Sequence, residues 1–168
     1  MNQVATPPEF PEVPDLNWSA QLATGDSRMD QTHVEFVELL ARLRATPPAD
    51  QLPLFKELTA HTVEHFEQED RWMLATGFTA KNCHTEQHKS ILDTLHAVEE
   101  HYLKGDADII SRMADAMAEW FPAHAATMDA GLAQHLKSVG FDSVTETLPD
   151  PSLVRPATMS GCGSVSCS

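Results

Sequence analysis

Residues 55–72 read FKELTAHTVEHFEQEDRW and predict a long amphipathic helix. Apolar and ligand-type residues recur there every three or four positions, which is the period of a helix with one buried side. The residues of this stripe are Phe55, Leu58, Thr62, His65, Glu69 and Trp72. An imidazole and a carboxylate therefore stand four residues apart on the side that should face a core. We expect this helix to end at Gly77.

Three further helices are predicted around this one. The same period runs through residues 30–46, residues 82–104 and a segment that opens at Asp106 or Asp108 and ends near Gly140. Asp30 and Asn82 are the predicted N-caps of the first two. Short connections between helices of similar length imply antiparallel neighbours. The predicted fold is all-α, an antiparallel up-down-up-down four-helix bundle.

The bundle is predicted to occupy residues 15–140. Residues 1–14 contain four prolines and should form an extended N-terminal arm. Residues 141–168 are rich in proline, serine and glycine, so we expect a flexible tail. Cys162 and Cys167 lie in this tail, where a disulfide, weak metal binding or no role all stay open. The tail is also a candidate contact for an unknown protein partner.

Length and composition narrow the classes of function. A chain of 168 residues suits one domain with a sizeable core. A net charge of −14 argues against nucleic-acid partners and anionic membrane surfaces. No run of about 18 apolar residues is present, and the N-terminus lacks the pattern of a signal peptide. With few cysteines as well, we expect a cytoplasmic protein.

Ligand-type residues occupy core-facing positions in all four predicted helices. They are His33, His65, Glu69, His84, His88, His124 and Asp129. Each such group buried without a partner costs about 1–3 kcal/mol, so a metal site would account for all of them together. Five imidazoles and two carboxylates suit iron, with zinc or manganese as substitutes. Seven ligands exceed one tetrahedral site but suit two ions bridged by Glu69 and Asp129, with room for an exogenous molecule.

The spacing of the last two ligands is unusual. His124 and Asp129 lie five residues apart, which on an ideal α-helix places them about 140° apart around the axis. A locally widened turn would bring them to the same side. Pro122 removes a backbone hydrogen bond in this helix, so we also expect a kink between Ala118 and Pro122.

The order His, His-x-x-x-Glu, His-x-x-x-His, His-x-x-x-x-Asp resembles the hemerythrin family over about residues 18–137. The stretches Asp30-Gln31-Thr32-His33, His65-Phe66 and Trp120-Phe121 are also similar to bacterial hemerythrins. The resemblance implies two non-haem iron ions joined by an oxo or hydroxo group and by the two carboxylates. His84, His88 and His124 would bind one iron, and His33 and His65 the other. Dioxygen would bind reversibly at the iron with fewer histidines.

The resemblance also implies a pocket for dioxygen, walled by Phe36, Trp120, Phe121 and Ala125. Position 125 is commonly a bulky aliphatic residue in the family, so Ala125 should widen the pocket. His61 stands where an aromatic is common, one turn before His65, and is a candidate to hydrogen-bond a ligand or to replace one. His96, His101 and His135 are predicted to bind no metal.

Two main functions follow. The leading one is a non-enzymatic oxygen-binding protein for storage, delivery or sensing. The alternative is a di-iron redox enzyme that acts on peroxide, nitric oxide or ferrous iron, which a wider pocket would favour. A third is an interaction module in which iron acts as a switch and the cysteine tail as its output.

Overall fold

Helices joined by loops make up the part of the chain that the structure describes. This computed structural model describes residues 15–78 and 83–154. Its α-helices are α1 (Ser27–Arg44), α2 (Gln51–Ala75), α3 (Cys83–Leu103), α4 (Ile109–His124) and α5 (Ala130–Ser138). Short 3-10 turns lie at Pro48–Asp50 and Pro151–Leu153, and a π-helical turn at Ala125–Asp129 joins α4 to α5. The described residues form no strand, only an isolated bridge between Asp142 and Thr147. The predicted all-helical class is confirmed.

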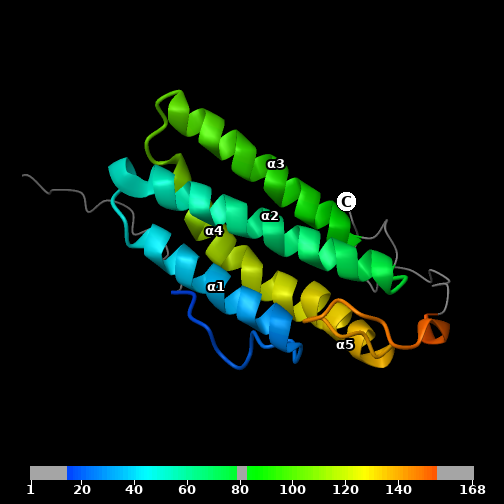
Figure 1. The fold of residues 1–168 in the computed structure, drawn as a ribbon. Coiled ribbons are helices and arrows are strands. Elements are labelled where there is room, and N and C mark those ends of the chain that lie inside the picture. Colours follow the sequence, from blue (N-terminus) through cyan, green and yellow to red (C-terminus); the bar gives the residue numbers. More distant parts are fainter. Residues whose placement is uncertain (1–14, 79–82, 155–168) are drawn as a thin grey trace, which may run out of the picture.

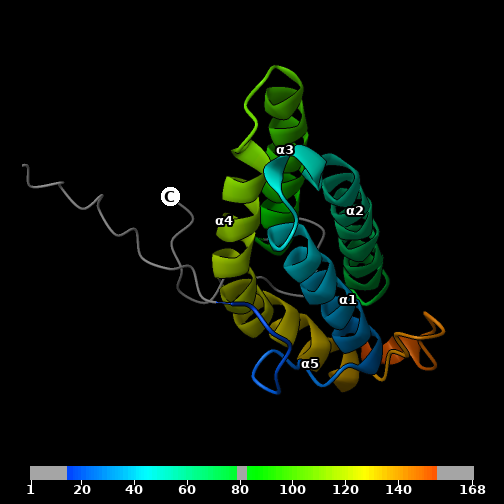
Figure 2. The ribbon, with the colours of Figure 1, turned by 90° about the vertical axis from the view of Figure 1, so that its left-hand side faces the viewer.

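The four long helices pack side by side as a bundle. Helix α1 contacts α2 and α4, and α3 contacts the same two helices from the other side (Figure 1). Helices α2 and α4 also contact each other. Figure 2 shows that the axis of α5 departs from that of α4 beyond the π-helical turn. The fourth predicted helix is therefore two α-helices joined by a wide turn.

Helix α1 begins earlier than the sequence predicts. Asp26, not Asp30, is the N-cap, and its Oδ1 accepts hydrogen bonds from the backbone nitrogens of Arg28 and Met29 at 3.1 and 2.9 Å. Asp30 lies inside the first turn and accepts a hydrogen bond from the backbone nitrogen of Thr24 at 2.7 Å. The prediction of Asp30 as the cap was wrong, because this carboxylate ties down the preceding loop instead.

Glycines end α2 and α5 where the sequence predicts. Gly77 and Gly140 adopt φ values of 67° and 68°, a left-handed conformation that L-residues with side chains rarely take. The residue after each glycine then donates its backbone N–H back into the helix: Phe78 to Met73 O and Phe141 to Leu136 O, both at 2.9 Å. The predicted Asn82 cap lies outside the described residues.

The core has two parts. The first is formed by α1 to α4 and contains the predicted pocket residues Phe36, Phe121 and Ala125. The second lies between the end of α2, the start of α1, α5 and the chain after α5. It consists of Met29, Trp72, Met73, Leu132, Ala133, Leu136, Val139 and Phe141, with Phe78 and Leu148 packed against it.

The second core cluster includes residues beyond the predicted end of the bundle at residue 140. The sequence predicts a flexible tail from residue 141, but Phe141 is buried and Leu148 packs beside it. Glu146 also pairs with Arg71 of α2 at 2.8 Å. Apolar residues of the loop after α5 therefore contribute to the core, and the division of the chain at residue 140 stays a prediction. The predicted arm 1–14 and residues 155–168, with Cys162 and Cys167, lie outside the described residues.

Candidate metal centre

All seven predicted ligand residues lie in the interior of the bundle, and none is more than 3% exposed. Helix α1 supplies His33, α2 supplies His65 and Glu69, and α3 supplies His84 and His88. His124 is the last residue of α4, and Asp129 ends the π-helical turn. The four-residue spacings in α2 and α3 place each pair on one side of its helix, facing the other helices.

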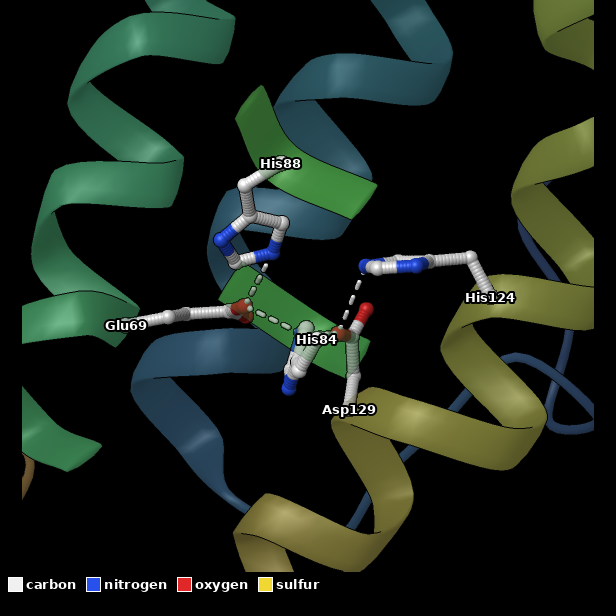
Figure 3. A group of neighbouring side chains, drawn as sticks. All are labelled: Glu69, His84, His88, His124 and Asp129. Carbon is white, nitrogen blue, oxygen red and sulfur yellow. Dashed lines mark ion pairs between the residues drawn. The ribbon is translucent and has the colours of Figure 1, made fainter. Parts of the chain in front are cut away.

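The ligand atoms form two overlapping groups. Within each group, all ligand atoms lie within 4.8 Å of one another. The larger group is Glu69, His84, His88, His124 and Asp129, and the smaller is His33, His65, Glu69 and Asp129. Figure 3 shows the side chains of the larger group converging from α2, α3, the end of α4 and the π-helical turn. Only the two carboxylates belong to both groups.

The two oxygens of each carboxylate face different groups. Glu69 Oε2 lies 3.2 Å from His84 Nε2 and 3.3 Å from His88 Nε2, whereas Oε1 lies 3.0 Å from His65 Nε2. Asp129 Oδ1 lies 3.0 Å from the Nε2 atoms of both His84 and His124, and Oδ2 lies 3.1 Å from His33 Nε2. Each carboxylate thus turns one oxygen toward each cluster of imidazoles, as a group bridging two centres must.

Most of these atoms have no hydrogen-bond partner. The buried ligand atoms without a hydrogen-bond partner are His33 Nε2, His84 Nε2, His88 Nε2, His124 Nε2, Glu69 Oε2, Asp129 Oδ1 and Asp129 Oδ2. They approach one another to about 3 Å without the angles of a hydrogen bond, so they converge on shared points. Buried unpaired polar groups are costly, and a bound cation would satisfy these nitrogen and oxygen donors together. The residues present fit a pair of metal ions.

The π-helical turn aligns the last two ligands. Helix α4 ends at His124, and the next five residues, Ala125–Asp129, form the wider turn that the spacing predicts. Wider turns of this kind occur mostly as single turns inside α-helices and are frequent at functional sites. The widened turn is confirmed. Helix α4 continues through Pro122 to His124. The expected kink between Ala118 and Pro122 stays a prediction.

In the two carboxylates and in His84, burial shifts the pKa in one direction and attraction between the carboxylates and the imidazoles shifts it in the other. Burial raises the pKa of the Glu69 carboxyl, and so does Asp129, but His65 and His84 hold the pKa well below its usual range. Burial also raises the pKa of Asp129, but its contacts with His124, His33 and His84 hold that pKa well below its usual range. Burial lowers the pKa of His84, but Asp129 and Glu69 raise it to about 9. The two carboxylates therefore stay ionised, ready to hold cations, and metal binding would displace a proton from His84.

Two of the imidazoles have a partner on their far side that the sequence does not predict. His88 Nδ1 lies 3.2 Å from Asp70 Oδ1, and His124 Nδ1 lies 3.0 Å from Gln87 Oε1. Both partners are sequence neighbours of ligands, which was the only signal available for them. Aromatic rings also hold these imidazoles: Phe66 stacks on His88 at 3.9 Å and Trp120 on His124 at 4.4 Å between ring centroids.

The predicted pocket residues divide between the two groups. Phe121 lies edge-on to His33, with ring centroids 5.1 Å apart, and 4.7 Å from Phe36. Ala125 is buried in the same core cluster. Trp120 lies against His124 of the other group and is only partly buried. The apolar wall beside the two-histidine group thus consists mainly of Phe36 and Phe121.

Two of the four remaining histidines make polar contacts outside the ligand groups. His61 Nε2 pairs with Glu35 Oε2 at 3.2 Å, and its ring centroid lies 6.4 Å from that of His65. It belongs to neither ligand group found among the described residues. His135 Nε2 lies 3.0 Å from Thr76 O and donates to it, so it joins α5 to the end of α2.

Helical bundles can hold two metal ions in their core through side chains of facing helices. The two histidine groups of this chain, which share two carboxylates, have the arrangement of that class. The family model described as "Hemerythrin HHE cation binding domain" matches residues 24–136. The chain is also 31% identical over 134 residues to "Bacteriohemerythrin" of Ralstonia nicotianae (strain ATCC BAA-1114 / GMI1000), covering 80% of this chain and 98% of that protein. The chain belongs to the hemerythrin family. No solved structure matches it.

One further finding concerns membranes. Among the residues described, no helix has the length and apolar character needed to cross a bilayer.

Proposed function

We propose that this protein binds two iron ions through its seven buried ligand residues and uses them to bind dioxygen reversibly. The observation that carries the proposal is the division of the carboxylate oxygens: each of Glu69 and Asp129 presents one oxygen to each group of imidazoles. The ligand set of imidazoles and carboxylates suits iron. Membership of the hemerythrin family supports the same assignment.

The two metal positions would differ in their number of protein ligands. His84, His88 and His124 would hold one ion, and His33 and His65 the other, while Glu69 and Asp129 would contribute to both positions. The two-histidine position lacks one imidazole, which leaves room there for a small ligand. When bound, a pair of ferrous ions supplies the two electrons that reversible dioxygen binding requires.

The surrounding residues would protect that position from water. Phe121 lies against His33, and Phe36 packs on Phe121, so apolar ring surfaces border the two-histidine group. His33, Phe36 and Phe121 are all buried. Exclusion of water limits proton entry, which favours release of intact dioxygen over its reduction. These side chains hold and shield the site without taking part in bond making.

Ala125 favours a second candidate function. It is buried in the cluster that contains Phe36 and Phe121, and its single methyl group fills less space than a bulky aliphatic side chain would. Easier access of water and small substrates would suit a di-iron redox enzyme acting on peroxide, nitric oxide or ferrous iron. In that case the same ligands would hold the metal pair, and the difference would lie in the lifetime of the oxygen adduct.

The rate of autoxidation separates the two functions. The reduced, iron-loaded protein is exposed to air, and its visible spectrum is followed for hours with and without added hydrogen peroxide. An oxygen carrier or sensor keeps an adduct that disappears on removal of oxygen and consumes little peroxide. Rapid conversion to an oxidised form with repeated consumption of peroxide would reject the carrier in favour of the enzyme.

The remaining expectations concern organisation and location. The contacts between successive helices support the predicted antiparallel up-down-up-down order of the bundle. The acidic composition and small number of cysteines support a cytoplasmic protein that binds neither nucleic acid nor membranes. A protein partner for the region after the bundle stays a proposal.

A further inference from the structure

The two candidate metal positions differ in what lies behind their imidazoles. At the three-histidine position, His88 Nδ1 faces Asp70 Oδ1 and His124 Nδ1 faces Gln87 Oε1, at 3.2 and 3.0 Å. Nδ1 of His33, at the two-histidine position, and Nδ1 of His84, at the three-histidine position, are both buried without a hydrogen-bond partner. Two of the three imidazoles at the three-histidine position are therefore held from behind by a polar side chain.

These contacts decide which ring nitrogen carries the proton. A carboxylate oxygen or an amide oxygen can only accept, so His88 and His124 must donate from Nδ1. Their Nε2 atoms then carry the free electron pair, and these are the atoms that point toward Glu69 and Asp129. The rings are thus held in the form and direction that metal binding needs.

We propose that Asp70 and Gln87 are positioning residues that make the three-histidine position the tighter of the two, so that it fills first and empties last. This inference rests on the proposed di-iron function. Asp70 holds His88, and Gln87 holds His124. The same position also has five ligand residues within reach, against four at the other.

Helix α2 holds the His88 ring by two separate contacts. Asp70 follows the bridging Glu69 directly, and Phe66, one turn earlier, stacks on the His88 ring with an interplanar angle of 5°. The Asp70 side chain is 42% exposed, whereas the His88 side chain is 2% exposed. Removal of the Asp70 carboxylate therefore leaves the packing of the core intact while it takes away the hydrogen bond to His88.

The test compares the variants D70A and D70N with the control D93A. Asp93 lies on α3 with a side chain 63% exposed, and it pairs with Lys89 and touches no imidazole that the structure describes. The full chain is loaded anaerobically with ferrous iron and titrated with a competing chelator, and the released iron is measured. For the wild type we expect two release steps.

In D70A the tighter step should weaken by about 10–100-fold while the looser step stays in place, as is typical when the partner of a metal-binding histidine is removed. D70N should retain most of the affinity, because its amide oxygen still accepts the hydrogen bond from Nδ1. D93A should follow the wild type. If circular dichroism shows that D70A is unfolded, Q87A replaces it, with the same expected loss of the tighter step.

Two outcomes overturn the inference. If the variants at positions 70 and 87 release iron as D93A does, the positioning role is wrong, although the di-iron proposal stands. If D70N weakens the tighter step as much as D70A, the charge of Asp70 matters and the positioning role is again wrong. A wild-type protein that binds no iron pair would instead remove the proposed function on which the inference rests.

Discussion

Removal of the metal should destabilise the folded protein strongly. Seven buried atoms of the candidate ligand residues have no hydrogen-bond partner among the described residues. Any ion that binds only the folded state stabilises it, by about 4 kcal/mol when its free concentration is a thousand times the dissociation constant. In a protein of this size about 1 kcal/mol corresponds to roughly 2–4 °C in Tm, so chelation should lower Tm by about 8–16 °C.

The assay is thermal unfolding followed by circular dichroism under anaerobic conditions. Wild-type protein is compared with saturating ferrous iron and with a strong chelator. The variant H96A is the matched control, because His96 is an exposed histidine of α3 outside both ligand groups, and it should keep the full difference in Tm. In H33A, which loses a ligand of the smaller group, the difference should shrink. Equal Tm values for the loaded and chelated wild type would refute the reasoning, because a saturated site in this core must stabilise the fold.

Three further substitutions test separate parts of the molecule. E69Q should lose iron from both positions, because the two oxygens of Glu69 face different groups. The control E67Q, on the exposed side of the same helix, should keep the wild-type iron content. Mass spectrometry measures the iron content of both variants. A125L should slow autoxidation of the oxygen adduct, because the larger side chain fills space beside the pocket. Overpacking should lower the free energy of unfolding by about 1–3 kcal/mol. An unchanged autoxidation rate would contradict a role for Ala125 in the access of water. F141A should lower the free energy of unfolding, measured in urea, by about 3 kcal/mol, because this ring is buried against Trp72. A loss below about 0.5 kcal/mol would mean that the loop after α5 does not belong to the core.

The burial and convergence of the seven candidate ligand residues were predictable because helical spacing fixes which residues share a face. His65 and Glu69, and likewise His84 and His88, lie four residues apart, so a buried stripe brings each pair to the same side. The five-residue step from His124 breaks this rule, and the resulting prediction of a wide turn agrees with the π-helical turn in the structure. Local periodicity was sufficient for both conclusions.

Contacts that depend on how helices rotate against one another were not predictable. Asp70 and Gln87 each reach an imidazole on a different helix, and nothing in their own helical period indicates this. Phe141 lies in a segment with no apolar period, so its burial depends on the position of α5 beside α2. Two aspartates compete for the start of α1, and only the backbone geometry of the preceding loop selects Asp26 over Asp30.

Iron content and visible absorption, measured together, test the central claim most directly. The protein is reduced anaerobically, its iron per chain is determined, and its spectrum is recorded before air, after air and after oxygen is removed again. We expect two irons per chain and a charge-transfer band that appears in air and disappears on deoxygenation. Absence of a bound metal pair would contradict the assignment of the seven buried residues as ligands, and a band that persists after deoxygenation would contradict reversible dioxygen binding.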